Sequence, residues 1–287
     1  AAALMSEVSP AALGGEAPGH LVGLTGPPGA GKSSLLSALL QFWRGSVQPT
    51  DGQQRTVAVL AVDPSSRRSG GSLLGDRARI DFDPADGGVL IRSTAAGERL
   101  GGLARGTRAA AHALAAAFDL VVIETVGVGQ AETEVADVAD TVTVVVQPGS
   151  GDVLQFLKAG IMEIPDVLVV TKADLGQIAT STRRDLSAAL RSLGSATTPV
   201  LTVSSLSPPT GVLELAAVLE EHRAGVDIPA RRLRARRAAA TSEFVAEHGE
   251  AGLRALGGRA AAGRLLEDQQ PGLEVPALVA VLERSLG

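Results

Sequence analysis

The sequence predicts an α/β fold of three layers, with a mainly parallel sheet covered by helices on both faces and a helical tail behind it. Seven short segments rich in β-branched residues occur between residues 20 and 203, and stretches with helical spacing of apolar residues separate several of them. Strands that alternate with helices form parallel sheets, because each connection has to cross back over the sheet. The 287 residues are 45% hydrophobic, which is enough to bury a large core in one or two domains. The predicted strands are residues 20–25, 56–63, 88–93, 119–124, 141–146, 167–170 and 200–203.

Residues 1–19 precede the first strand and are rich in Ala, Gly and Pro, so we expect at most a helical turn or two there. The first residues lack the basic flank and long apolar region of a secretory signal. No apolar run approaches the roughly 20 residues that a membrane span requires. We therefore expect a cytoplasmic protein without a membrane partner.

The first strand leads into the loop Gly26-Pro-Pro-Gly-Ala-Gly-Lys-Ser-Ser34, which matches the pattern G-x-x-x-x-G-K-[ST], and a helix is predicted at residues 35–43. Glycines allow backbone N–H groups to approach phosphate oxygens, and a helix start adds its dipole and unpaired N–H groups. We expect Lys32 to lie against the β- and γ-phosphates of a nucleotide and the Ser33 hydroxyl to ligate Mg²⁺. The predicted phosphate-binding residues are Gly26, Gly29, Ala30, Gly31, Lys32, Ser33 and Ser34.

Acidic residues follow two of the later strands. Asp63 ends the second strand, Asp76 lies farther along the Ser/Gly/Arg-rich segment behind it, and Glu124 ends the fourth strand. Ligands of open α/β sheets bind at the carboxyl ends of the strands, and acids near a phosphate loop commonly hold the metal ion. We therefore predict that Asp63, Asp76 and Glu124 join Ser33 around Mg²⁺. Helix-capping or solvated aspartates are the alternative for Asp63 and Asp76.

The segments after the fourth and fifth strands supply further candidates. Gly127 can donate its N–H to the γ-phosphate and so sense its presence. Gln130 is a candidate for orienting the attacking water, although a loop amide bonded to backbone is at least as good an interpretation. Only Lys32, Lys158 and Lys172 are lysines among the 26 basic residues, so these positions are candidates for sites that need a compact ammonium. For Lys158, which lies beyond the fifth strand, an ordinary surface lysine is the alternative.

The segment Thr171-Lys-Ala-Asp174 follows the sixth strand and indicates which base is bound. The Asp174 carboxylate can accept from both the ring N–H and the exocyclic amine of guanine, while the Lys172 stem packs along the ring. Adenine has no such pair of donors and would leave the carboxylate unpaired, which costs a few kcal/mol in a buried site. The sequence therefore predicts GTP and GDP as ligands. Backbone N–H groups after the seventh strand complete the base site, whose predicted residues are Thr171, Lys172, Asp174, Ser204, Ser205 and Leu206.

Composition excludes several other classes of protein. The absence of cysteine excludes disulfides, thiolate metal sites and thiol nucleophiles. A net charge of −5 and 2% aromatic residues argue against a nucleic-acid partner, which would require a basic face or stacking platforms. A nickel metallochaperone would carry Cys or His clusters, and a protein-targeting GTPase would carry a Met-rich domain; the chain has four His and two Met.

Beyond the helix predicted at residues 212–224, the arginine-rich run at 231–237 opens a helical, alanine-rich tail. We expect that run to be a solvated helix face rather than an RNA or membrane patch. Because the tail has few apolar residues of its own, we expect it to pack on the preceding domain or on a second subunit. The predicted division is an N-terminal extension at residues 1–19, a phosphate-loop GTPase domain at 20–225 and a C-terminal helical dimerisation region at 226–287.

Several consecutive motifs together resemble the MeaB/ArgK-type GTPases. This family comprises GTPase chaperones of adenosylcobalamin-dependent methylmalonyl-CoA mutase and was once described as arginine/ornithine transport kinases. The resemblance covers roughly residues 20–220 in order and with matching spacing, whereas the tail matches only loosely and the family's N-terminal helical extension looks shortened. The motifs that carry it are Gly26–Ser34, Val62–Ser66, Gly70–Asp76, Glu124–Gln130 and Gly160–Glu163.

The resemblance implies a phosphate-loop fold of the signal-recognition-particle and MinD-like (SIMIBI) class, a homodimer to which the C-terminal helices contribute, and the same four Mg²⁺ ligands. It also places Lys158 in a mobile loop that couples GTP hydrolysis to the mutase. The implied action is gating of adenosylcobalamin loading onto the mutase and protection of that enzyme. The family usually has Asn at position 171, where it ties the base-binding turn to guanine N7 and to the phosphate loop; we expect the shorter Thr171 hydroxyl to weaken that tie.

Two further functions remain open from the sequence. An ATP-dependent kinase or ATPase of a basic amino-acid transport system is one, and Asp174 argues against it. A scaffold that binds the nucleotide without hydrolysing it is the other. Because no arginine is placed by sequence as a finger, we expect slow intrinsic turnover, on the order of 10⁻⁴ to 10⁻² s⁻¹.

Overall fold

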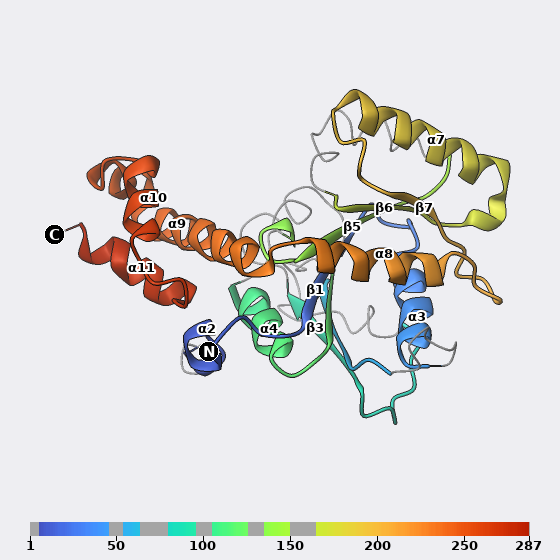
Figure 1. Cartoon of the computed structure of the whole chain (residues 1–287), viewed down its shortest axis with the longest axis horizontal. Coiled ribbons are helices and arrows are strands. Elements are labelled where there is room, and N and C mark those ends of the chain that lie inside the picture. Colours follow the sequence, from blue (N-terminus) through green and yellow to red (C-terminus); the bar gives the residue numbers. More distant parts are fainter. Residues whose placement is uncertain are drawn as a thin grey trace, which may run out of the picture. The chain divides into compact units, whose positions relative to one another are not determined.

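The computed structural model describes residues 6–45, 54–63, 80–95, 105–125, 135–149 and 165–286. The chain divides into two compact units, each of which is described here by itself (Figure 1). The first, called the sheet unit, comprises Gly19–Gly225. The second, called the helical unit, combines the chain up to Pro18 with Val226–Gly287.

A seven-stranded sheet forms the centre of the sheet unit, in the order β3-β2-β4-β1-β5-β6-β7. Every pairing between neighbouring strands is parallel, which confirms the predicted parallel sheet. β1, which leads into the phosphate loop, is central, and all six of its residues are buried. The strands are β1 (His20–Thr25), β2 (Val57–Asp63), β3 (Val89–Ala95), β4 (Leu120–Glu124), β5 (Thr141–Val146), β6 (Val167–Val170) and β7 (Val200–Thr202).

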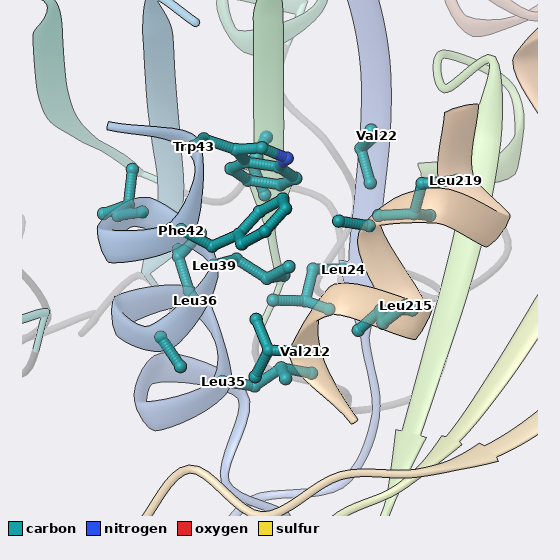
Figure 2. Packing of buried hydrophobic residues seen from close by; sticks show 14 of the residues in the cluster. Val22, Leu24, Leu35, Leu36, Leu39, Phe42, Trp43, Val212, Leu215 and Leu219 are labelled. Carbon is teal, nitrogen blue, oxygen red and sulfur yellow. The ribbon is translucent and has the colours of Figure 1, made fainter. Parts of the chain in front are cut away.

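Helices cover both faces of this sheet, as the three-layer prediction requires. On one face, α3 (Lys32–Trp43) and α8 (Val212–Gly225) pack against each other and against β1, and Figure 2 shows Phe42, Leu215 and Leu219 in this core. Figure 1 shows α7 on the opposite side of β6 and β7 from α8. The remaining elements of this unit are α4 (Arg105–Ala115), the 3₁₀ turn η3 (Ala173–Leu175) and α7 (Gln177–Ser192).

α7 has no counterpart among the predicted helices. Its buried residues are Ala179, Thr182, Leu186 and Leu190, so half of the buried positions are small or polar. The buried positions have helical spacing, but because two of them are Ala and Thr, large apolar residues do not mark this helix in the sequence.

The helical unit has a hydrophobic core of its own, although the tail was expected to have few apolar residues. Phe244 and Leu282 are completely buried within a cluster of residues from α9, α10 and α11. Three of the other eight buried members are alanines, namely Ala239, Ala240 and Ala262, and such small residues allow helices to approach closely. The helices are α2 (Pro10–Leu13), α9 (Ile228–Ala255), α10 (Arg259–Glu267) and α11 (Val275–Arg284).

The arginine-rich run in α9 was expected to be a solvated helix face, but the structure buries two of its arginines. Arg232 and Arg236 are each 2% exposed. Arg236 donates to both carboxylate oxygens of Glu16, at 3.0 and 2.7 Å, and to the carbonyl of Pro271 at 2.9 Å. Arg232 donates to the carbonyl of Ala17 at 2.7 Å. The segment before the first strand is therefore bound to the C-terminal helices through buried guanidinium groups.

Among the described residues, no helix combines the length and the apolar character that crossing a membrane requires.

Candidate nucleotide-binding site

The loop between β1 and α3 has a backbone that two of its glycines make possible. Gly26 has φ 141°, and a Cβ atom there would overlap the carbonyl oxygen of Val145 in β5. Gly31 has φ 88° and caps α3, which begins at Lys32. Both φ values lie in the region that favours glycine, so the loop turns tightly and directs the start of the helix at the edge of the sheet.

An open cleft of about 560 Å³ lies at this edge. Residues from the phosphate loop, from β2 and from the end of β4 line it together with Lys172 of the base turn. Its position at the carboxyl ends of parallel strands is where α/β sheets bind their ligands. The lining residues are Pro28, Gly29, Gly31, Lys32, Ser33, Ser34, Ala61, Val62, Glu124, Thr125 and Lys172.

The Lys32 ammonium lies inside the curve of the phosphate loop. Its Nζ donates to the carbonyl oxygens of Gly26 at 2.7 Å and Pro27 at 3.1 Å, and the residue is only 8% exposed. The positive charge is thereby held beside the backbone N–H groups of the loop and the start of α3. This arrangement concentrates positive potential where an anionic phosphate would bind.

Ser33 and Glu124 meet at the floor of the cleft. The Ser33 hydroxyl donates to Oε1 of Glu124 at 2.8 Å, and Glu124 is 7% exposed. Adjacent ligands of an octahedral Mg²⁺ ion lie about 2.9 Å apart, given metal–oxygen distances of about 2.0–2.1 Å. These two oxygen donors therefore fit a Mg²⁺ ion. They come from neighbouring elements because β4 pairs with β1, which leads into the loop.

The other predicted metal and coupling residues are described only in part. The backbone of Asp63 ends β2, and β2 pairs with β4 so that Ala61 lies opposite Glu124. The structure describes the backbone of Asp63 but not its side chain. Asp76, Gly127, Gln130 and Lys158 lie outside the described residues.

The base turn begins at Thr171, which connects it to the phosphate loop. The Thr171 hydroxyl lies 2.6 Å from the carbonyl oxygen of Ala30 and 3.2 Å from that of Val146, and the residue is 3% exposed. Lys172 follows with φ 52°, a positive value in a residue other than glycine, and its Nζ donates to Oε1 of Gln147 at 2.9 Å. The turn therefore holds the Lys172 stem at the cleft.

Asp174 and the segment after β7 also lie together. The Ser204 hydroxyl donates to Oδ1 of Asp174 at 2.8 Å and accepts from the N–H of Leu206 at 3.3 Å. Ser204 is buried and is fixed by paired backbone bonds with Thr210, each 3.0 Å long. Asp174 is exposed and so accessible to a ligand. The structure thus brings Asp174, Ser204 and Leu206 together, as the sequence predicts.

Three polar residues at the site, Thr25, Thr125 and Gln147, were not among the predicted residues. Thr125 lines the cleft, and its hydroxyl donates to that of Thr25 at 2.7 Å in a buried position. Gln147 accepts from Lys172. Each of the three directly follows or ends a predicted strand, so strand ends alone could have identified them.

The fold and the site together define a phosphate-loop nucleotide-binding protein with a base turn of the guanine type. The chain belongs to the family described as methylmalonyl-CoA mutase-associated GTPase MeaB, whose sequence model matches residues 1–254. It is therefore a member of a family of GTPases, as the motifs predict.

Curated relatives are consistent with this family. A protein of Pyrococcus abyssi, named provisionally as a GTPase, is 43% identical over 212 residues, which are 71% of this chain and 62% of that protein. The mitochondrial methylmalonic aciduria type A homolog of Caenorhabditis elegans is 44% identical over 154 residues, which are 53% of this chain and 36% of that protein. The chain therefore spans less than two thirds of the length of these relatives.

A solved structure supports the fold of the whole chain. The crystal structure of an LAO/AO transport system kinase superposes with a TM-score of 0.60 at 25% identity, covering 99% of this chain and 85% of that one. The structure of HypB from Helicobacter pylori in complex with nickel superposes with a TM-score of 0.53 at 19% identity, covering 78% of this chain and 95% of that one. At that identity the second match shows the fold alone.

Proposed function

We propose that this protein binds GTP with Mg²⁺, hydrolyses it slowly, and uses that cycle to gate adenosylcobalamin loading onto methylmalonyl-CoA mutase and to protect the enzyme. One observation carries the GTP part of the proposal. The base turn and the phosphate loop are joined by the contact between the Thr171 hydroxyl and the Ala30 carbonyl, 2.6 Å long. Groups suited to a guanine and groups suited to phosphates therefore belong to one site.

The phosphate end of the site acts by positioning and charge. Lys32 and the N–H groups at the start of α3 would neutralise charge on the phosphates, and Ser33 and Glu124 would hold Mg²⁺. When bound, Mg²⁺ supplies further positive charge to the phosphate oxygens. We further propose Asp63 and Asp76 as its remaining ligands, Gly127 as the sensor of the γ-phosphate and Lys158 as the residue that couples hydrolysis to the mutase.

Replacing Lys32 with Ala tests the phosphate site. The substitution removes the charge that faces the phosphates, so we expect calorimetry to detect no tight binding of GTP. Retained tight binding would show that the nucleotide phosphates bind elsewhere.

Base selectivity is tested by calorimetric titration of the purified protein with GDP and with ADP, both with Mg²⁺. We expect tight GDP binding and none for ADP. Asp174→Ala should weaken GDP binding by a hundredfold or more, because two donors of guanine lose a charged acceptor worth about 1.5–3 kcal/mol per hydrogen bond. Asp185→Ala, on the exposed face of α7, is the matched control and should bind GDP as the native chain does.

Equal or preferred binding of ADP would reverse this interpretation. An ATP-dependent kinase of a basic amino-acid transport system would then be the better function. GDP binding without measurable release of phosphate from GTP would instead indicate a nucleotide-binding scaffold.

The client and assembly parts of the proposal rest on the family and on the relative named for methylmalonic aciduria. We propose a cytoplasmic homodimer. Its chain would comprise an N-terminal extension at residues 1–19, a GTPase domain at 20–225 and a region at 226–287 that contributes to the dimer. The test is GTP turnover with and without methylmalonyl-CoA mutase, with analytical ultracentrifugation of both mixtures. No stimulation and no co-sedimentation would remove the mutase from the proposal and leave the GTPase.

A further inference from the structure

Outside the nucleotide site, three potential metal ligands meet in the helical unit. Glu247 and His248 lie on α9 and Glu283 lies on α11. One ligand atom from each side chain lies within 4.8 Å of the other two. His248 and Glu283 are half-buried and Glu247 is exposed, so the cluster is accessible from solvent.

The chain holds the His248 ring in a defined position. α9 is broken directly after this residue, since Gly249 has φ 66° and ψ −179° inside the helix. The ring packs on Phe244, a completely buried residue, with the ring centroids 4.7 Å apart and the planes 34° from parallel. Gly252 leaves room for the His248 side chain, because a Cβ at position 252 would lie 2.6 Å from the Cβ of His248. These contacts direct Nε2 toward Glu283 on α11.

We propose that Glu247, His248 and Glu283 form a binding site for a divalent transition-metal ion of the Zn²⁺ type. An imidazole nitrogen with two carboxylates is a set that such ions accept, whereas Mg²⁺ and Ca²⁺ prefer oxygen ligands alone. Three protein ligands leave a fourth tetrahedral position for water. The two carboxylates also provide the negative charge that a divalent ion offsets.

The spacing of His248 and Glu283 fits such an ion. His248 Nε2 and Glu283 Oε1 are 3.3 Å apart, longer than the roughly 2.7–2.9 Å of a strong charge-assisted hydrogen bond. In a tetrahedral Zn²⁺ site, metal–ligand distances of about 2.0–2.2 Å place two ligand atoms about 3.3–3.6 Å apart. An ion could therefore bind between these two atoms at their present separation.

Metal binding at this position would connect α9 to α11 next to the break at Gly249. An ion that binds only the folded state stabilises that state by mass action. The site would therefore make the stability of the helical unit depend on the transition-metal concentration, independently of GTP.

The test uses the full chain, stripped with EDTA and dialysed, in a buffer with excess Mg²⁺ and no nucleotide at pH 7.5. Calorimetric titration with Zn²⁺ should show one ion bound per chain, and titration with Co²⁺ should give the visible absorption of a tetrahedral site. His248→Ala and Glu283→Gln should each weaken Zn²⁺ binding at least tenfold. Glu250→Gln is the matched control, because this α9 carboxylate pairs with Arg259 at 2.9 Å outside the cluster, and it should leave binding unchanged.

Thermal unfolding followed by circular dichroism provides a second measurement. Zn²⁺ should raise the thermal unfolding midpoint of the native chain and of Glu250→Gln but not that of Glu283→Gln. The fold should tolerate Glu283→Gln, because it is an isosteric change at a half-exposed side chain. Equal Zn²⁺ affinity in the native chain and the His248 and Glu283 variants would overturn the proposal. No binding at millimolar Zn²⁺ would also overturn it and leave an ordinary ion pair between His248 and Glu283.

Discussion

The Thr171 hydroxyl carries a single proton, and its shorter contact is with the carbonyl of Ala30. The connection between the base turn and the phosphate loop therefore exists although Thr replaces the amide usual in the family. A hydroxyl that donates to Ala30 has no second proton for guanine N7, whereas an amide NH₂ has two. The substitution should thus preserve the loop contact and remove the contact with the base.

Changing Thr171 separates these two effects. Thr171→Val leaves the buried carbonyl oxygen of Ala30 without this donor, so we expect a loss of about 1–3 kcal/mol in the free energy of unfolding. Thr171→Ser keeps the hydroxyl and serves as the control, with a loss of less than about 1 kcal/mol. Urea denaturation measures both; equal losses would show that the methyl group, and not the hydrogen bond, matters here.

Glu274 gives the helical unit a pH dependence. Burial raises the pKa of this carboxyl above its usual range, while Arg236 acts in the opposite direction and Glu16 adds to the rise. A raised pKa means that the folded chain binds this proton more tightly than the unfolded chain. The stabilisation is complete below the unfolded pKa of about 4.3 and is lost as the pH rises through the folded value.

Glu274→Gln should therefore raise the free energy of unfolding at neutral pH, because a neutral amide does not become charged in a buried position. The difference from the native chain should vanish as the pH falls to about 3, where Glu274 is protonated in both states. Denaturation across this pH range is the measurement. A variant less stable than the native chain at pH 7 would show that attraction to Arg236 outweighs burial.

At the scale of the element, the apolar runs predicted all seven strands, since a buried parallel strand needs such a run. The phosphate loop and α3 were likewise predicted from a local sequence pattern. α7 was missed because its buried positions are partly Ala and Thr. Partners such as Thr25 and Thr125, which are 100 residues apart, could be recognised only as strand ends, because their pairing depends on which strands are neighbours in the sheet.

Gly26 and Gly29 provide a matched pair of substitutions within one element. Gly26→Ala combines φ 141° with overlap of the Val145 carbonyl, so we expect a loss of roughly 2–5 kcal/mol in stability, from strain and overpacking together. Gly29→Ala has φ 79° but open space around the new methyl group, so its loss should be limited to about 1–2 kcal/mol of backbone strain. Chemical denaturation without nucleotide compares them, and equal losses would contradict this account of the β1–β5 contact.

At the scale of the whole molecule, the sequence did not predict that the segment before β1 belongs with the C-terminal helices. The arginine spacing at residues 232 and 236 places both side chains on one helix face, but a solvated face has the same pattern. Only the position of Glu16, 220 residues away, distinguishes the two interpretations. Sequence patterns describe single elements well and describe such long-range contacts poorly.

Removing Glu16 should destabilise the helical unit strongly. Glu16→Ala leaves the Arg236 guanidinium buried without its carboxylate, and breaking one side of a buried pair costs about 3–5 kcal/mol. Glu250→Ala breaks an exposed pair with Arg259 and should cost less than about 1 kcal/mol. Thermal unfolding followed by helical circular dichroism checks both. Similar midpoints for the two variants would mean that the Glu16 contact is not formed in solution.

Trp43, at the end of α3, gives the molecule an optical property. It is the single tryptophan of the chain, there is no tyrosine, and it is 4% exposed in the core between α3 and the sheet. Ultraviolet emission therefore comes almost entirely from one position in the sheet unit, while the helical unit contributes none from tryptophan or tyrosine. Fluorescence therefore follows the melting of the sheet unit, whereas circular dichroism follows the helices of both units, and a difference between the two curves reports on the helical unit without any label.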